Sequence, residues 1–164
     1  MIFVTVGAQM PFDRLVTTVD RWAGARGRAD VFAQIGETDY RPSHIRWARF
    51  LDPAEFMRRF EAAGAIVAHA GTGSIITALQ LGKPILVMPR RASMRETRND
   101  HQVATAERFA RFDSVAVAWD EKELAARLEE IDSLDGRQAV GPHASHVLVG
   151  AIRGFIDGAD ASSL

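Results

Sequence analysis

Short apolar runs alternate along this chain with longer stretches in which apolar residues recur every three or four positions. The longer stretches predict amphipathic helices. The short runs predict six buried strands, at Ile2–Val6, Asp30–Ile35, Ile45–Phe50, Ala65–His69, Ile85–Met88 and Val115–Trp119. Strands that alternate with helices are typical of a parallel sheet with helices on both faces. We therefore predict an α/β fold with a Rossmann-like parallel sheet of about six strands.

Several helix starts are marked by capping residues. Pro11 is expected at the first helical position after the first strand. Asp52 predicts an N-cap, with Glu55 placed to close a capping box. A tight loop at Gly71–Ser74 is expected to precede a helix that begins near Ile75.

The last third of the chain predicts a helix at His101–Phe112 and a closing helix. The apolar stripe of the closing helix is Val147, Leu148, Ala151, Ile152, Phe155 and Ile156. We expect this stripe to pack on the chain's own sheet, with a partner's surface as the alternative. No linker divides the chain, so we predict one domain at 1–157 and a frayed tail at 158–164.

Composition narrows the classes of function. The chain has 164 residues, of which 47% are hydrophobic and 25% charged, a globular balance with enough length for a core. It has no cysteine, which excludes disulfides, zinc–thiolate sites and cysteine nucleophiles. A net charge of −1 argues against a nucleic-acid partner. The start of the chain is not typical of a signal peptide, and no apolar run approaches the roughly 20 residues of a membrane span, so we expect a cytoplasmic protein.

Charge is unevenly distributed along the chain. Four arginines and one glutamate between Arg90 and Arg98 give a local charge of +3, which makes this segment a candidate for contact with an anion. Eight acidic residues against Lys122 and Arg127 give −6 between Phe112 and Asp135, as expected of a solvated helix face.

Function is expected at one edge of the predicted sheet. Right-handed crossovers place every strand-to-helix loop at the same edge. Ligands of such folds bind there, at the carboxyl ends of the strands. The loops of interest are Gly7–Pro11, Phe50–Asp52, Ala70–Ser74 and Pro89–Asp100.

Two of these loops contain glycines placed for phosphate binding. In Gly71–Ser74, glycines let backbone N–H groups approach a phosphate, and the following helix adds partial positive charge. Gly7–Gln9 holds the same position after the first strand. The alternative is an ordinary turn, with Thr72 or Ser74 as an N-cap. The spacing is neither that of a P-loop nor that of a dinucleotide-binding fingerprint, because Gly82-Lys83 comes after the helix and no third glycine follows.

The loop after the fifth predicted strand combines cations with amides. Arg90 suits a phosphate or carboxylate, whereas Asn99, Asp100 and Gln102 suit sugar hydroxyls. The alternative is a solvated loop in which Asn99 or Asp100 caps the next helix. His69, before the glycine loop, is a candidate base or phosphate donor, with a structural histidine as the alternative. We predict no metal site, since no cluster of histidines and carboxylates has ligand spacing.

Five motifs lie in or beside these segments. They are Val4-Thr5-Val6-Gly7, Phe12-Asp13-Arg14-Leu15, His69-Ala70-Gly71-Thr72-Gly73-Ser74, Gly82-Lys83-Pro84 and Asn99-Asp100-His101-Gln102. Together they resemble the glycosyltransferase family 28 C-terminal domain, from Ile2 to about Ile131. The resemblance is closest to small standalone members, which include the catalytic subunit of the two-component UDP-GlcNAc transferase of N-glycan assembly and bacterial exopolysaccharide relatives.

The resemblance implies the donor-binding lobe of a GT-B enzyme. Such a UDP-sugar-dependent hexosyltransferase moves a hexose or hexuronic acid, with inversion, to a polyprenyl-diphosphate-linked acceptor in exopolysaccharide or lipid-linked oligosaccharide synthesis. The UDP-sugar is a substrate, and no cofactor is obligatory. A membrane-anchored acceptor-binding subunit would complete the cleft and hold the chain at the inner face of the plasma membrane. The alternatives are a non-catalytic nucleotide-binding enhancer of a partner glycosyltransferase and, for assembly, a homodimer.

The resemblance also implies UDP-sugar-binding residues by position. Gly7 and Gln9 match the first loop, Phe50 and Leu51 the segment whose backbone meets uracil, and Thr77 the ribose contact. Thr77 stands where longer relatives have an acidic residue, so its hydroxyl offers the ribose a weaker contact. The diphosphate loop and sugar-binding region match Gly71, Thr72, Gly73, Ser74, Asp100, His101 and Gln102.

Loop chemistry adds Arg90 and Asn99 to this set. His69 is the catalytic candidate, as a general base or in contact with the leaving group. Otherwise the base comes from the partner.

Overall fold

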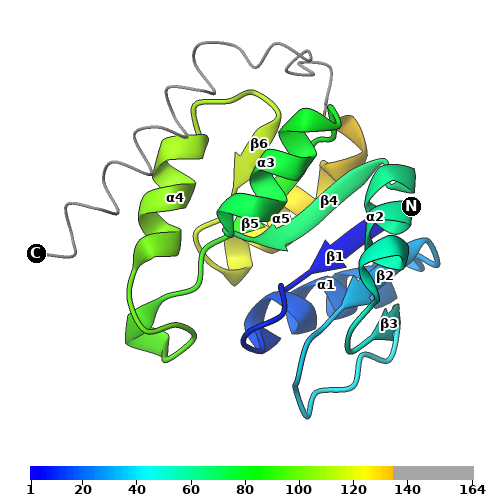
Figure 1. Ribbon diagram of the computed structural model, residues 1–164. Helices are drawn as coiled ribbons and strands as arrows, with labels where there is room; N and C mark the ends of the chain where they lie inside the picture. Colours follow the sequence, from blue (N-terminus) through cyan, green and yellow to red (C-terminus); the bar gives the residue numbers. More distant parts are fainter. Residues whose placement is uncertain (135–164) are drawn as a thin grey trace, which may run out of the picture.

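Six parallel strands form one sheet in the order β3-β2-β1-β4-β5-β6 (Figure 1). The computed structural model describes residues 1–134, so the predicted closing helix and the tail at 158–164 lie outside the described residues. The strands are β1 (Ile2–Thr5), β2 (Val31–Gln34), β3 (Arg46–Ala48), β4 (Ala65–His69), β5 (Ile85–Met88) and β6 (Val115–Val117).

Helices cover both faces of the sheet. They are α1 (Asp13–Arg26), α2 (Pro53–Ala62), α3 (Thr72–Gln80), α4 (His101–Phe109) and α5 (Glu121–Glu129), with 3-10 turns at Ala92–Met94 and Ile131–Ser133. One core layer joins α1 and α5 to the sheet, and a second joins α2, α3 and α4 to its other face. The predicted α/β class, with its six parallel strands, is confirmed.

Alternation along β1 shows how the strands supply both layers. Val4 packs with the α1–α5 layer, whereas Phe3 packs with the opposite one. The Phe3 ring makes edge contacts with Phe56 and Phe60 of α2, at centroid distances of 5.3 and 6.1 Å. Because successive strand residues face opposite sides, an apolar run without alternation is what a sheet buried on both faces requires.

A buried carboxylate fixes the segment that leads into β3. Asp20 of α1 is 2% exposed and accepts hydrogen bonds from the backbone N–H groups of Ser43, His44 and Ile45 and from the Tyr40 hydroxyl. Burial alone would raise the pKa of Asp20, but these donors outweigh it and hold the pKa below its usual value. The carboxylate therefore substitutes for regular secondary structure in this connection.

Two details of the predicted caps are corrected. Helix α1 begins at Asp13, so Pro11 precedes the helix instead of opening it. Asp52 does cap α2, accepting from two backbone N–H groups at 3.0 Å. Glu55 does not close a capping box, because its carboxylate pairs with Arg59 at 2.6 Å, one turn along the helix.

The chain reverses its course across the sheet between β1 and β4. These strands pair directly, but β1 leads to α1 on one face and β4 leads to α3 on the other (Figure 1). Loops that diverge in this way leave a crevice at the carboxyl ends of the strands, which is where open α/β sheets bind ligands.

Candidate functional site

A cavity of about 330 Å3 lies at this crevice. It is lined by Val6, Gly7, Ala8, Gln9, His69, Arg90 and Gln102. Five predicted site residues, from the loop after β1, the end of β4 and the segment from β5 into α4, therefore share one cavity. They are Gly7, Gln9, His69, Arg90 and Gln102.

The His69 imidazole occupies space that two glycines leave free. A Cβ added to Gly7 would lie 2.8 Å from His69 Cε1, and one added to Gly71 would lie 2.3 Å from His69 Nε2. Gly7 also has a φ of +77°, a conformation that side chains disfavour. Glycine is thus required at both positions by the histidine between them, as well as by any ligand.

His69 is held in its neutral form. Burial, with a contribution from the Arg90 charge, lowers its pKa to about 4, although the Thr5 backbone offsets part of the decrease. Nδ1 is buried and makes no hydrogen bond within the described residues. A pKa near 4 makes His69 a weak general base at neutral pH.

Arg90 places a positive charge inside the cavity wall. It is 4% exposed, and its Nη2 donates to the Val6 carbonyl at 2.7 Å and to the Met10 carbonyl. Its Nε is buried without a hydrogen-bond partner in residues 1–134. Burial lowers the pKa of Arg90, with partial compensation from Glu96, but an arginine stays charged in proteins. Arg90, which the sequence predicted as an anion contact, therefore also holds the loop after β1 in place through two hydrogen bonds.

The glycine motif forms the first turn of α3, which corrects the predicted loop. Helix α3 starts at Thr72, with Gly71 as N-cap and no side-chain cap, so neither Thr72 nor Ser74 is the N-cap. The first intrahelical bond is donated by Ile75 to Gly71, which leaves the N–H groups of Thr72, Gly73 and Ser74 without a backbone acceptor in residues 1–134. A Cβ on Gly73 would meet nothing within 4 Å. Free N–H groups at the start of a helix are a feature of anion sites.

Several predicted polar residues also hold the backbone. Thr77 donates its hydroxyl to the Gly73 carbonyl at 2.9 Å. Asp100 accepts from Ala92 N–H at 2.9 Å, whereas Asn99 accepts from the N–H of exposed His101 at 3.4 Å, as a cap would. Gln102 accepts from the backbone N–H of Arg90 at 3.2 Å. The loop after β5 is therefore fixed from several sides.

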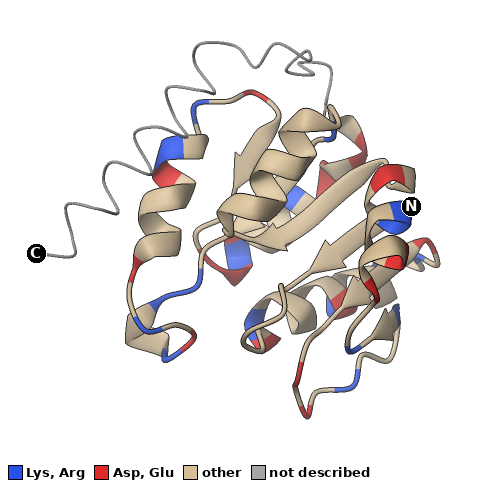
Figure 2. Ribbon diagram, viewed as in Figure 1, with Lys and Arg blue, Asp and Glu red and all other residues tan. Residues whose placement is uncertain are grey.

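An ion pair that the sequence did not indicate adds to this framework. Glu96 accepts from Arg14 Nε at 2.8 Å and Arg14 Nη2 at 2.9 Å, and also from Arg91 N–H. The Arg91 side chain donates to the Trp119 carbonyl. The basic segment before α4 is visible in Figure 2, and its first two arginines are engaged by the protein itself.

The segment implied for uracil contact is joined to this site through a missed residue. Phe50 is 49% exposed, and Leu51 N–H donates to Gln34 Oε1 at 3.1 Å. Gln34 Nε2 donates to the Gly7 carbonyl at 3.5 Å. The sequence did contain a signal for Gln34, because Gln34 is the single amide in the otherwise apolar strand β2 and is its last residue.

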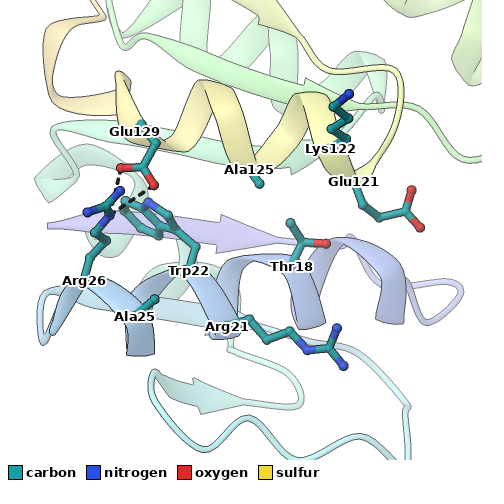
Figure 3. Close-up of a pocket in the computed structure, with 9 residues that line it drawn as sticks. All are labelled: Thr18, Arg21, Trp22, Ala25, Arg26, Glu121, Lys122, Ala125 and Glu129. Atoms are coloured by element: carbon teal, nitrogen blue, oxygen red, sulfur yellow. Dashed lines mark hydrogen bonds and ion pairs between the residues drawn. The ribbon is translucent and has the colours of Figure 1, made fainter.

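A second cavity, of about 560 Å3, lies between α1 and α5 (Figure 3). An ion pair between Arg26 and Glu129, 2.9 Å long, crosses it beside Trp22. No predicted site residue lines it. Its place between helices, away from the strand ends, favours the first cavity as the functional one.

Neither metal clusters nor membrane spans are found within residues 1–134. No group of three or more histidines and carboxylates gathers there as metal ligands would. No helix of that part of the chain is long and apolar enough to cross a membrane.

Comparison with known proteins settles the family. The model of the glycosyltransferase family 28 C-terminal domain matches residues 1–146. The chain belongs to this family. The resemblance carried by the five motifs is thereby confirmed at the level of the family. A search of curated proteins finds no match.

Solved structures similar to this family 28 domain come from GT-B glycosyltransferases. The NMR structure of ALG13 is 21% identical with a TM-score of 0.62, covering 93% of this chain and 96% of that one. The glycotransferase of kitacinnamycin is 20% identical, with a TM-score of 0.58, and the match covers 93% of this chain but 38% of that one. SnogD from Streptomyces nogalater is 18% identical, with a TM-score of 0.51, covering 94% of this chain and 43% of that one.

These likenesses show the fold, that of the C-terminal domain of GT-B glycosyltransferases. The family 28 domain spans less than half the length of the kitacinnamycin and SnogD chains that it matches.

The buried neutral His69 predicts an acid-sensitive stability for this family 28 domain. Its folded pKa of about 4 lies below the ordinary 6.5, so the unfolded chain binds more protons between these values. Above pH 6.5 the neutral imidazole makes its full contribution to the free energy of unfolding. This contribution decreases as the pH falls, and the loss reaches about 3 kcal/mol near pH 4. His69→Gln should remove most of this loss in urea unfolding experiments.

His101→Gln, at an exposed position, is the matched control and should keep the wild-type loss. Equal pH dependence in the wild type and His69→Gln would contradict the assignment.

Proposed function

We propose that this family 28 domain binds the diphosphate of a UDP-sugar at the crevice between β1 and β4. The proposal is carried by three neighbouring features: His69 and the buried Arg90 line one cavity, and Gly71, the N-cap of α3, lies against His69. Each of these three features suits an anion for a different physical reason.

Electrostatics support a diphosphate as the ligand. The Arg90 guanidinium is buried and forms no hydrogen bond with a carboxylate of residues 1–134, so its charge acts through a medium of low dielectric constant. The amino-terminal end of α3 adds partial positive charge and unpaired N–H donors. A neutral His69 can donate a hydrogen bond without adding a charge that an empty site would have to bury.

The same groups explain how the domain would promote sugar transfer. The acceptor hydroxyl attacks the anomeric carbon, the bond to UDP breaks, and the electron pair of that bond remains on the β-phosphate oxygen. The hydroxyl proton passes to a general base, and in this proposal the partner supplies that base. Fixed donors at α3 and the positive charge of Arg90 would stabilise the negative charge that develops on the departing UDP in the transition state.

The finer parts of the proposal concern the acceptor and the partner. The acceptor is a polyprenyl-diphosphate-linked saccharide of exopolysaccharide or lipid-linked oligosaccharide synthesis, and the transferred sugar is a hexose or hexuronic acid. A membrane-anchored subunit binds that acceptor and completes the cleft at the inner face of the plasma membrane. Support for these parts is the resemblance of the motifs to two-component members of the family.

Gly73→Val should weaken UDP binding without unfolding the domain. A Cβ at Gly73 meets no protein atom within 4 Å, and valine in a helix costs no more than glycine, so stability should be unchanged. The side chain would instead block the approach of a phosphate to the first turn of α3. We expect UDP affinity in calorimetry to fall by at least about tenfold, the loss of one good hydrogen bond to a charged group.

Gly64→Val is the matched control. A Cβ there meets only the Met1 carbonyl, at 3.8 Å, and Gly64 precedes β4, at the opposite edge of the sheet. Its UDP affinity should equal that of the wild type. Wild-type affinity in Gly73→Val would mean that Gly73 is only part of a turn.

Transfer itself should require the partner. The purified chain with a UDP-sugar and a lipid-linked acceptor is expected to show no turnover, and membranes that contain the acceptor-binding subunit should restore it. Turnover that survives Gly73→Val in the restored system would indicate a non-catalytic enhancer. Full transfer by the purified chain alone would contradict the two-component proposal.

A further inference from the structure

A buried amide connects the two loops on either side of β2. Gln34 is 5% exposed, and a buried amide is costly unless its polar atoms are hydrogen-bonded. Its Oε1 accepts from Leu51 N–H at 3.1 Å, and its Nε2 donates to the Gly7 carbonyl at 3.5 Å. Leu51 follows β3 and Gly7 follows β1, the two neighbours of β2 in the sheet. The side chain therefore acts on two loops at the carboxyl edge.

The bond to Leu51 sets the direction of the Phe50 carbonyl. Residues 1–134 contain no cis peptide, and in a trans peptide the N–H and the C=O point in opposite directions. Leu51 N–H points at the buried amide. The Phe50 carbonyl, in the same peptide, therefore points away from Gln34, on a residue that is 49% exposed.

The bond to Gly7 acts on the neighbouring loop in the same way. The Gly7 carbonyl points at Gln34, so the N–H of Ala8, in the same peptide, points to the other side. Ala8 lines the cavity of about 330 Å3 beside His69 and Arg90. Gln34 thus directs a backbone donor on one loop and a backbone acceptor on the other.

We propose that Gln34 is a positioning residue that couples recognition of the base to recognition of the diphosphate. The inference rests on the proposed function. In it, the Phe50 carbonyl accepts the N3–H of uracil and the Ala8 N–H donates to the diphosphate. Cytosine carries a lone pair at N3 in place of the N–H, so a fixed carbonyl selects UDP over CDP. The amide of Gln34 supplies both the acceptor and the donor that the two loops require.

Gln34→Met tests the coupling, because methionine has nearly the same length and offers neither polar partner. We expect the wild type to bind UDP at least about tenfold more tightly than CDP, since a site built to bond N3–H rejects a base that lacks it. Gln34→Met should weaken UDP binding and bring the ratio of the two dissociation constants close to one. If Gln34 had a merely structural role, its replacement would weaken the binding of both nucleotides equally and leave the ratio of their dissociation constants unchanged.

Gln34→Glu separates the two loops. At alkaline pH the carboxylate can still accept from Leu51 N–H, but it cannot donate to the Gly7 carbonyl. We expect UDP and CDP to lose affinity by a similar factor while the selectivity for UDP persists. This variant also serves if Gln34→Met does not fold, because it keeps the size and polarity of the side chain.

Asp20→Asn controls for lost stability. Its hydrogen bonds hold residues 40–45 and touch neither loop, so the variant should unfold more easily and keep the wild-type ratio. A folded Gln34→Met or Gln34→Glu with wild-type affinity and selectivity would overturn the inference alone. Absence of UDP binding by the wild type would overturn the proposed function and the inference together.

Discussion

The direct pairing of β1 with β4 is the contact on which the site depends. In this register Thr5 lies opposite Ala68, so the residues that follow, Gly7 and Gly71, come to either side of His69. The same pairing marks the place where the chain reverses across the sheet, which leads the two following helices to opposite faces. One register thus determines the packing of the histidine and the opening of the crevice.

Arg90 adds a buried positive charge to that crevice. Its guanidinium donates to the carbonyls of Val6 and Met10, which fix the charge in place, and no carboxylate of the described part of the chain, residues 1–134, is hydrogen-bonded to it. The Arg14–Glu96 pair holds the following loop from the outside. Rigid placement matters because a preorganised donor stabilises developing charge without reorganising during the reaction. The cost of burying this cation is consistent with selection for an anionic ligand.

Much of the fold follows from the sequence, because short apolar runs that alternate with amphipathic helices are typical of a parallel, helix-covered sheet. The loops with Gly7, His69 and Arg90 could be assigned to one edge by the same reasoning. Details that depend on individual hydrogen bonds could not be predicted from the sequence. Gln34 resembled an isolated polar residue at the end of a strand, and its role is evident only when two loops from other strands reach it. The glycine motif was expected as a loop, but helix α3 includes it.

The central claim is that a nucleoside diphosphate binds between the β1 loop and the first turn of α3. A titration of the isotope-labelled chain with UDP, followed by the NMR signals of backbone amides, tests it most directly. The account predicts saturable shifts at Ala8, Thr72, Gly73 and Ser74, whose N–H groups are placed to donate to the ligand. Shifts confined to the α1–α5 cavity, at Ala25 and Ala125 for example, or no shifts at all, would contradict it.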